Sequence, residues 1–316
     1  MATLARRLPA NVPGALFVDS SCIDCGACRW IAPASFDLVG SQSRVHAQPR
    51  DALQRARAAE ALLSCPTASI GVARASGTAA DDAADDAPPL HREVVAAAGR
   101  FPRPFAPRAL HCGFHREASF GATSWLLLRP AGNVLIDVPR FTAPLVRRLE
   151  QQGGVRWLFL THRDDVDGHA QFAAHFGCER LLHRGDHGAA TAGVERLLDG
   201  DAPIELDDDL VALPTPGHTR GSTCLLARTP AGADPAIAPP LLFSGDHLAW
   251  DDATARPYGF RDACWHSWPQ LIESTRRLVA HPFEWLLPGH GAPGRAPAAE
   301  MAARLRGAIA EMEQER

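Results

Sequence analysis

Four cysteines near the N-terminus constrain this chain more than any other feature. Cys22, Cys25 and Cys28 follow one another at intervals of three residues, and Cys65 stands directly before Pro66. Three thiolates on one short loop can surround a compact metal cluster, and a cysteine from another element can complete the set of ligands. The spacing therefore predicts an iron–sulfur cluster. The alternative is a structural zinc site, but such sites usually combine two separate C-x2-C pairs, and this chain lacks that arrangement.

The cysteine segment resembles a single-cluster ferredoxin. The bacterial ferredoxin run reads C-x2-C-x2-C-x3-C-P, and its fourth cysteine serves a second cluster. In this chain Ala32 occupies that fourth position while Pro33 is retained, and no second run of this kind exists. The resemblance implies a small α+β domain with one four-iron four-sulfur (4Fe-4S) cluster, whose ligands would be Cys22, Cys25, Cys28 and Cys65.

The bulk composition limits the classes of function. The 316 residues suffice for one large core and a small domain, and the net charge of −4 argues against nucleic acid as a partner. All 32 basic residues are arginine, so catalysis by lysine is excluded. No stretch approaches 18 apolar residues, so we expect no membrane span. The cysteines outside the cluster set are expected to be reduced in a cytoplasmic protein; they are Cys112, Cys178, Cys224 and Cys264.

The sequence divides into three parts. Residues 1–75 form the predicted ferredoxin-like domain, with a helix expected over 51–63. Residues 76–108 are rich in small, acidic and proline residues, which is typical of a linker. Residues 109–316 alternate short apolar runs with helical patterns, which predicts a large α/β domain. Its expected strands cover 124–128, 134–138, 155–160, 210–213, 222–227, 241–243 and 285–287, and its expected helices cover 170–176, 269–279 and 297–313.

Several of these apolar runs end beside a residue that can bind a metal ion. If the runs are strands of one fold, their ends place these side chains along one sheet edge, where imidazole nitrogens and carboxylate oxygens can converge on a metal. Glycines beside three of them allow the backbone to turn sharply. The residues at the four strand ends are His162, His218, Asp246 and His290.

The surrounding motifs resemble those of the metallo-β-lactamase superfamily, and the resemblance covers roughly residues 109–295. The matching stretches are PGHTRGS over 216–222, SGD over 244–246 and LPGHG over 287–291. The resemblance implies an αββα sandwich with a metal site in a shallow cleft at one edge. It also implies that Asp246 bridges two metal ions.

The first metal loop departs from the family pattern T-H-x-H-x-D-H. It reads THRDDVDGH over 161–169 and is two residues longer than expected. Counted from His162, Asp164 occupies the place of the family's second histidine. Counted from His169, Gly168 occupies the place of the family's aspartate. The register of this loop therefore stays open between the two alignments.

The resemblance implies two metal positions that share Asp246. Asp165 or Asp167 would fill the vacancy in the loop, and Asp164 or Asp167 would accept a proton during catalysis beside the bridging Asp246. The additional carboxylates favour iron or manganese over zinc. The expected ligands are His162, Asp164, His218 and Asp246 for the first ion, and His169, Asp246 and His290 for the second.

Two further groups of side chains match no metal-binding motif. His183, Asp186 and His187 follow an apolar pair, and we expect them to be ordinary loop residues. The aromatic residues within 249–268 either line a substrate pocket or pack in the core.

The favoured hypothesis is hydrolysis that depends on one or two divalent metal ions, zinc, iron or manganese. The resemblance implies a small-molecule substrate that is an ester, thioester, lactone or phosphodiester. A second hypothesis is a non-haem iron redox enzyme that receives electrons from the cluster, together with an electron-transfer partner. A third is a non-catalytic protein that senses redox state or docks to a partner. No nucleic acid and no membrane are expected as partners.

Overall fold

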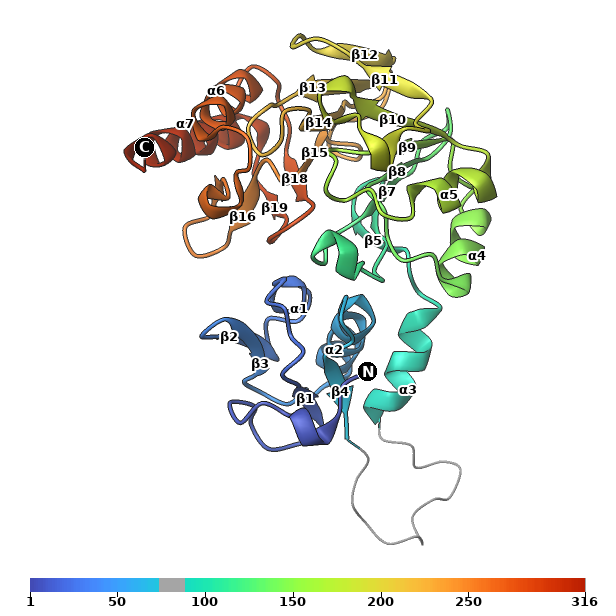
Figure 1. Cartoon of the computed structure of the whole chain (residues 1–316), viewed down its shortest axis with the longest axis vertical. Coiled ribbons are helices and arrows are strands. Elements are labelled where there is room, and N and C mark those ends of the chain that lie inside the picture. The colour runs from blue at the N-terminus through green and yellow to red at the C-terminus, as the bar shows by residue number, and fades with distance from the viewer. Residues whose placement is uncertain (74–88, 316) are drawn as a thin grey trace, which may run out of the picture. The chain divides into compact units, whose positions relative to one another are not determined.

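The computed structural model describes residues 1–73 and 89–315. The chain forms two compact units, and Figure 1 shows their elements. The first unit, which contains the four cysteines, includes two segments from the sequence predicted to be the large domain. The first unit comprises Met1–Arg103, Cys112–Ala122 and Pro139–Leu149, and the second comprises Pro104–His111, Thr123–Val138 and Glu150–Arg316.

The first unit is a small α+β fold whose elements are β1 (Leu16–Val18), α1 (Ala27–Ile31), β2 (Phe36–Val39), β3 (Gln42–Val45), α2 (Ala52–Ser64), β4 (Ile70–Val72) and α3 (Pro89–Ala98). Strand β1 pairs with β4, and β2 pairs with β3, both antiparallel. Apolar residues from these elements form one core, which includes Leu16, Phe36 and Ala59. The predicted α+β fold of this part is confirmed.

Helix α2 leads directly to the last of the four cysteines. The Asp51 carboxylate accepts a hydrogen bond from the Gln54 N–H at 2.8 Å and so caps the start of the helix. The helix ends at Cys65 because the Pro66 ring that follows cannot continue it. The predicted and observed helices agree to within one residue at each end.

The expected linker over 76–108 differs from the structure in its second half. Residues 76–88 of this range lie outside the described residues. Helix α3 follows and packs against α2, with Leu90 and Ala97 buried. The apolar side of this segment has a helix to pack against, so it forms an amphipathic helix where proline-rich composition predicted a linker.

The second unit contains two sheets, of seven and six strands. The first sheet has the order β11-β10-β9-β8-β7-β6-β5, with β5 (Arg103–Ala106), β6 (Ala109–His111), β7 (Trp125–Leu127), β8 (Val134–Ile136), β9 (Trp157–Phe159), β10 (Glu179–His183) and β11 (Arg196–Leu198). The second has the order β12-β13-β14-β15-β18-β19, with β12 (Ile204–Asp207), β13 (Leu210–Pro214), β14 (Thr223–Ala227), β15 (Leu241–Gly245), β18 (Trp285–Pro288) and β19 (Gly294–Arg295). A separate hairpin joins β16 (Ala249–Asp251) and β17 (Arg256–Tyr258), and the helices are α5 (His169–Phe176), α6 (Trp268–Leu278) and α7 (Ala298–Gln314). Helix α4 (Ala143–Gln151) belongs mostly to the first unit.

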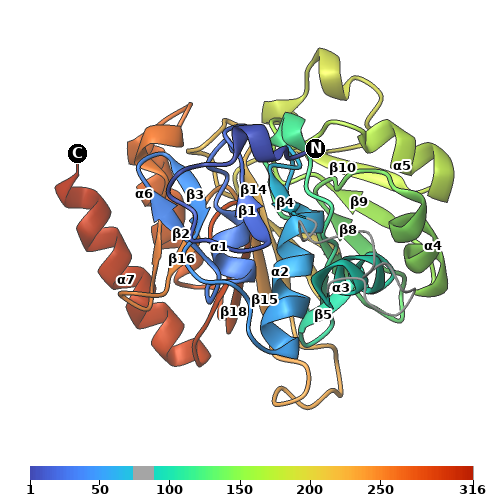
Figure 2. The same cartoon turned by 90° about the horizontal axis from the view of Figure 1, so that it is seen from below.

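The two sheets pack face to face. The Trp125 indole N–H donates to the Pro288 carbonyl at 2.9 Å, and the Thr223 N–H donates to the Thr161 carbonyl at 2.9 Å. On the other face of the six-stranded sheet, α6 and α7 lie side by side (Figures 1 and 2) and share its apolar core. Helix α5 contacts β10 of the seven-stranded sheet. Every residue of β13, β14 and β15 is buried because both faces of these strands are covered. The predicted αββα sandwich is confirmed.

The strand directions bring the predicted ligands together. Strands β8, β9 and β10 are parallel, as are β15 and β18, so their carboxyl ends meet at one edge of the sandwich. The loops that follow β9, β13, β15 and β18 carry His162, His218, Asp246 and His290 respectively.

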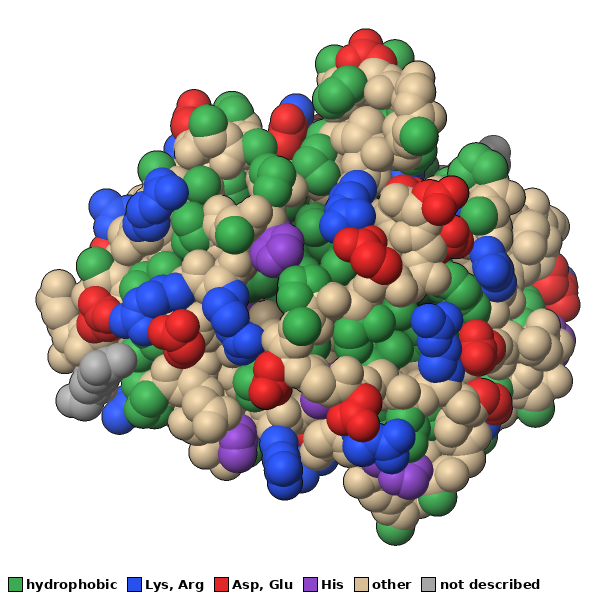
Figure 3. Space-filling model, turned by 90° about the horizontal axis from the view of Figure 1, so that it is seen from above, with side chains coloured by type: hydrophobic (Ala, Val, Ile, Leu, Met, Phe, Trp, Pro, Cys, Tyr) green, Lys and Arg blue, Asp and Glu red, His purple; other side chains and the backbone are tan. Residues whose placement is uncertain are grey.

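The surface of the molecule is mixed in charge on the face that Figure 3 shows, where Arg side chains alternate with Asp and Glu side chains. This face shows no continuous basic patch. Among residues 1–73 and 89–315, no helix is both long enough and apolar enough to cross a membrane.

A buried charge cluster joins the two sheets. Arg129 lies in the β7–β8 connection, and its side chain is only 2% exposed. Its Nε donates to Asp209 Oδ1 at 3.0 Å, and its terminal nitrogen donates to Asp207 Oδ2 at 2.9 Å. Both aspartates belong to the β12–β13 hairpin of the other sheet. The cluster therefore fixes two hairpins of different sheets to each other.

We expect Arg129→Ala to lower the free energy of unfolding by about 1–3 kcal/mol, because it removes the hydrogen bonds to Asp209 and leaves that carboxylate only the longer contact with Arg108, at 3.5 Å. Chemical denaturation of the full chain, followed by tryptophan fluorescence, measures the change. The control is Arg228→Ala, which removes an exposed ion pair with Glu205 (side chains 42% and 60% exposed). The control should change the free energy by less than about 1 kcal/mol. Equal losses in the two variants would contradict the assignment.

Candidate metal centre and cysteine site

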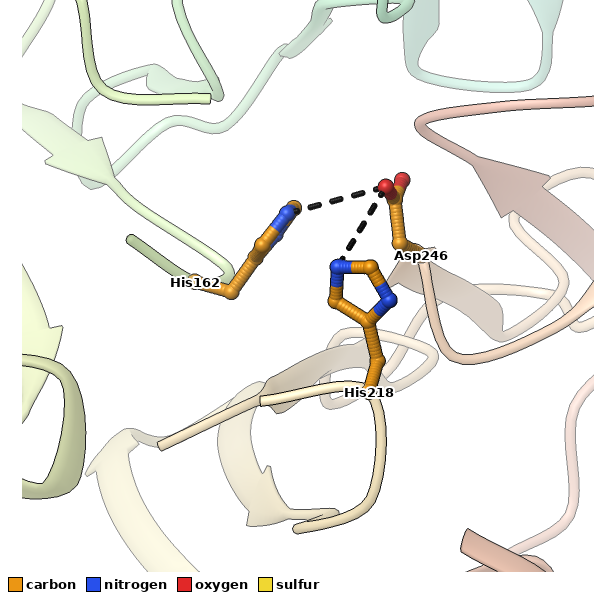
Figure 4. A group of neighbouring side chains, drawn as sticks. All are labelled: His162, His218 and Asp246. Carbon is orange, nitrogen blue, oxygen red and sulfur yellow. Dashed lines mark ion pairs between the residues drawn. The ribbon is translucent and has the colours of Figure 1, made fainter. Parts of the chain in front are cut away.

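Two groups of metal-ligating side chains overlap at the carboxyl ends of the strands. The first contains His162, His218 and Asp246, and the second contains Asp165, Asp246 and His290. In each group, one ligand atom per residue lies within 4.8 Å of the others. Figure 4 shows that His162 and His218 direct their rings toward the Asp246 carboxylate.

Asp246 lies between the two groups. Its Oδ2 is 3.6 Å from His162 Nε2 and 3.7 Å from His218 Nε2. Its Oδ1 and Oδ2 are 2.8 and 2.9 Å from His290 Nδ1. This one carboxylate thus contacts ligand-type residues of both groups, as a bridging ligand would.

A glycine allows Asp246 to reach this position. Gly245 ends β15 with a φ of +51°, a left-handed conformation that side chains rarely adopt. A Cβ atom at this position would lie 2.4 Å from Thr161 Oγ1, in the loop that carries His162. The absence of a side chain therefore lets the two ligand-bearing loops approach each other closely.

Burial raises the pKa of both buried carboxylates, whereas their charged neighbours shift the two pKa values in opposite directions. Burial raises the pKa of Asp165 well above its usual value, and the Asp246 carboxylate raises it further. Burial also opposes ionisation of Asp246, but His290, His162 and His218 hold its pKa below the usual range. Burial lowers the pKa of His162, which favours the neutral imidazole that binds metals. A cation between these groups would allow both carboxylates to be ionised.

The first loop supplies two of its predicted carboxylates to this region. Asp164 Oδ2 lies 3.3 Å from His218 Nε2, and its side chain is 39% exposed, so it faces the solvent side of the centre. Asp165 is 2% exposed, and its Oδ2 lies 3.8 Å from His162 Nε2. Asp167 is exposed and belongs to neither group. Of the two candidates for the vacant position, the structure brings in Asp165.

The expected position of His169 needs correction. His169 begins α5, its Nε2 lies 3.0 Å from the Ala190 carbonyl, and the Arg180 guanidinium donates to its Nδ1 at 3.1 Å. Both ring nitrogens are therefore engaged away from the centre, Nδ1 with β10 and Nε2 with the turn over Ala189–Thr191. The two additional residues of the loop carry His169 away from the centre, and Asp165 stands with Asp246 and His290 in its place.

Two residues behind the ligands were not among the predicted site residues. Asp137 is fully buried after β8, accepts hydrogen bonds from the Thr161 N–H and hydroxyl at 2.9–3.0 Å, and has a pKa that burial raises to about 7. The Thr161 hydroxyl lies 2.9 Å from His162 Nδ1 and so orients that ring. Asp137 follows a buried strand, as the predicted ligands do, so the signal was present in the sequence.

Asp186 connects the loops of His162 and His218. Its carboxylate accepts hydrogen bonds from the Arg163 N–H at 3.0 Å, from the Gly221 N–H at 2.8 Å and from the Thr219 hydroxyl. Asp186 is 3% exposed. As expected, Asp186 belongs to neither group of ligand atoms, but it has a structural role because its partners lie on loops distant in sequence.

The solvent side of the centre carries an aromatic side chain. Trp265 is 62% exposed, and its ring centroid lies 6.2 Å from that of His218. The Trp265 and His266 N–H groups both donate to the His218 carbonyl at 3.0 Å. A cavity of about 1100 Å³ borders the same loop, with Pro216, Arg220 and His266 in its lining.

The four N-terminal cysteines are brought together around α1 and the end of α2. Cys28 and Cys65 are buried, and Cys22 and Cys25 are half-buried. Burial raises the pKa of the Cys25 thiol to about 12, and burial also raises the pKa of Cys28. The Ser69 N–H donates to Cys65 Sγ at 3.2 Å.

Comparison with known proteins identifies the first unit. Residues 18–72 match the family described as the 4Fe-4S single cluster domain of Ferredoxin I. This range contains all four cysteines.

A curated protein and several solved structures resemble parts of this chain. A hydroxyacylglutathione hydrolase of Citrobacter koseri is 29% identical over 131 residues, which cover 39% of this chain and 46% of that protein. The chain thus spans about half the length of this curated relative.

Among solved structures, the metallo-β-lactamase DIM-1 aligns with a TM-score of 0.51 at 15% identity, over 68% of this chain and 97% of that chain. The subclass B3 metallo-β-lactamase BJP-1 of Bradyrhizobium japonicum aligns with a TM-score of 0.46 at 15% identity, over 68% and 95%. The alignment with DIM-1 shows the fold. The chain therefore joins a domain that matches the 4Fe-4S single-cluster ferredoxin family to a domain with the metallo-β-lactamase fold.

Proposed function

We propose that this protein is a metal-dependent hydrolase with two metal positions that share Asp246. The observation that supports the proposal most directly is the convergence of imidazoles and carboxylates on that one side chain at the sheet edge. The first position would be held by His162, Asp164, His218 and Asp246, and the second by Asp165, Asp246 and His290.

The donor atoms fit a metal ion. His162 Nε2 and Asp165 Oδ2 are buried without a hydrogen-bond partner, and the buried His218 Nε2 lies 3.3 Å from the half-exposed Asp164. A buried polar atom without a partner costs about 1–3 kcal/mol. Coordination of a metal would satisfy several of these atoms at once. The positive ion would also reduce the repulsion between the carboxylates of Asp165 and Asp246.

The side chains of the centre would have different roles in the proposed hydrolysis. A divalent ion held by these residues would supply a nucleophile at neutral pH by lowering the pKa of water from about 15.7 to about 7. Asp164 stands on the solvent side, where the carboxylate oxygen that does not bind the metal would accept the proton that the reaction releases. Thr161 and Asp137 keep the His162 ring in orientation, and Asp186 holds the two histidine loops together.

We propose an ester-type substrate, with thioesters as the first class to test. The curated relative is named as a hydrolase of hydroxyacylglutathione, which is a thioester. Other esters, lactones and phosphodiesters are the alternative classes for the same centre. The exposed ring of Trp265 beside His218 provides an apolar surface for the acyl part of such a substrate.

A second candidate function is redox chemistry at iron. The proposed ligands comprise the carboxylates of Asp164, Asp165 and Asp246 and the imidazoles of His162, His218 and His290, an oxygen-rich set that favours iron or manganese more than an all-histidine set does. In that case the cluster would pass electrons to the iron, and an electron-transfer protein would be a partner. Hydrolysis by protein loaded with zinc alone would exclude this function.

We also propose that Cys22, Cys25, Cys28 and Cys65 hold one 4Fe-4S cluster. The family match over residues 18–72 supports it. A single tetrahedral zinc would hold its sulfurs about 3.8 Å apart, given a zinc–sulfur distance of about 2.3 Å. In the described part of the chain, the groups of ligand atoms within 4.8 Å of one another contain no cysteine. A larger cluster fits this wider spacing, and its iron would ionise thiols whose pKa burial raises.

We expect Asp165→Asn to reduce the metal content of the large domain from about two ions to about one, because an amide is a weaker ligand than a carboxylate at the second position. Elemental analysis after equilibration with limiting metal measures this. Asp167→Asn makes the same chemical change on the same loop outside both groups and should leave the content unchanged. The opposite pattern would show that Asp167 is the ligand.

His218→Ala should lower kcat/KM for whichever thioester is hydrolysed by at least ~100-fold, since a lost ligand removes several kcal/mol of transition-state stabilisation. The assay uses full-length protein loaded in turn with zinc, iron(II) and manganese(II). His175→Ala, on the exposed side of α5, is the matched control and should retain activity. Hydrolysis that persists in His218→Ala at the wild-type rate would refute the proposed centre.

Cys25→Ser should remove the brown colour of protein purified without oxygen and reduce its content from about four irons and four sulfides. Cys178→Ala, a buried cysteine of the large domain, should leave both unchanged. Colourless wild-type protein with one zinc on these cysteines would overturn the cluster assignment.

A further inference from the structure

The cysteine site is built partly from the sequence of the large domain. Cys112–Ala122 and Pro139–Leu149 belong to the same compact unit as the cysteines, although each lies between strands of the seven-stranded sheet in the sequence. Each segment places one residue beside the cysteines, Gly121 from the first and Arg140 from the second.

The backbone of Gly121, which carries no side chain, lies directly against Cys25. Its φ is +84°, and a Cβ atom there would lie 2.8 Å from Cys25 Cβ, 3.0 Å from Cys25 Sγ and 3.0 Å from Pro66 Cγ. The Gly121 carbonyl lies 2.9 Å from His115 Nδ1, and its N–H donates to the Arg116 carbonyl at 2.9 Å. The segment is therefore held in contact with a cysteine sulfur, in a place where no side chain fits.

Arg140 brings a charge to Cys65. Its guanidinium donates to the Leu63 carbonyl, two residues before Cys65, at 2.8 Å, and its backbone N–H donates to the Phe114 carbonyl at 2.8 Å. Its Nε is buried without a hydrogen-bond partner. Burial lowers the pKa of Arg140, the Cys65 thiolate raises it, and the neighbouring Arg116 lowers it.

This environment leaves Arg140 half-buried, with its Nε fully buried. A guanidinium does not lose its proton in a protein. The guanidinium lies at the turn just before Cys65, so a negatively charged group held by the cysteines would stabilise it.

We propose that Arg140 is part of the iron–sulfur site, where its guanidinium is the counter-charge of the cluster and raises the cluster's midpoint potential. The inference rests on the proposed cluster. Four thiolates around a cubane core carry a net charge of about −2, which becomes about −3 when one electron is added. A fixed positive charge stabilises the reduced form more than the oxidised form, and its removal moves the potential to more negative values.

The test is a redox titration of the full-length protein, in which dithionite supplies the electron and absorbance and electron paramagnetic resonance report the cluster. Arg140→Gln should shift the midpoint potential to more negative values, and Arg140→Lys should shift it less. Arg100→Gln is the matched control, because it makes the same change in net charge on an exposed residue that pairs with Glu93 in the same unit. This control should match the wild-type protein.

A second variant tests the covering segment. Gly121→Ala should lower the iron and sulfide content per chain, since its methyl group would meet Cys25, while the metal content of the large domain stays unchanged. Equal potentials in Arg140→Gln, Arg100→Gln and wild-type protein, with full cluster content, would overturn the role of Arg140 and leave the cluster assignment intact. Wild-type protein without a cluster would overturn both. If Arg140→Gln does not fold, the shift in Arg140→Lys relative to Arg100→Gln decides.

Discussion

The candidate metal centre depends on the buried carboxylate of Asp246. Burial opposes its charge, and three imidazoles from three different loops hold that charge in place. This arrangement requires the parallel pairing of β15 and β18, because that pairing puts Asp246 and His290 at neighbouring strand ends. It also requires the absence of a side chain at Gly245, because the loop of His162 passes directly against it. The two sheets and their connections thus serve to bring four strand ends to one carboxylate.

Much of this arrangement could be predicted from the sequence, because it depends on strands that are buried on both faces. Such strands appear as short, continuous apolar runs, and β13, β14 and β15 were expected within two residues of their bounds. Strands at the edges were not expected, since β11 and β12 are short and carry charged residues. The four ligands at strand ends follow from the same pattern, since each stands two to five residues after an apolar run.

The parts that the sequence did not predict depend on contacts between distant segments. The path of the loop over 161–169 is decided by Arg180 and Ala190, which engage both ring nitrogens of His169 and leave Asp165 beside Asp246. Asp186 acquires its role only because Arg163, Thr219 and Gly221 are folded around it. The two segments of the large-domain sequence that belong to the cysteine unit could not be recognised from the sequence for the same reason, since Gly121 and Arg140 lie in no motif.

The covering of the cysteine site by Gly121 and Arg140 has a consequence for the modularity of the chain. A cut between residues 75 and 109, where the sequence suggests independent domains, would separate the cysteines from the backbone that shields Cys25 and from the cation beside Cys65. Asp137, three residues before Arg140, binds the Thr161 that orients His162, and Thr123, two residues after Gly121, donates to the carbonyl of Gly289 beside His290. Neither half of the chain can therefore be replaced independently of the other. Any recombination that replaces one of them must carry these two connecting segments with it, and insertions in them would disturb both centres together.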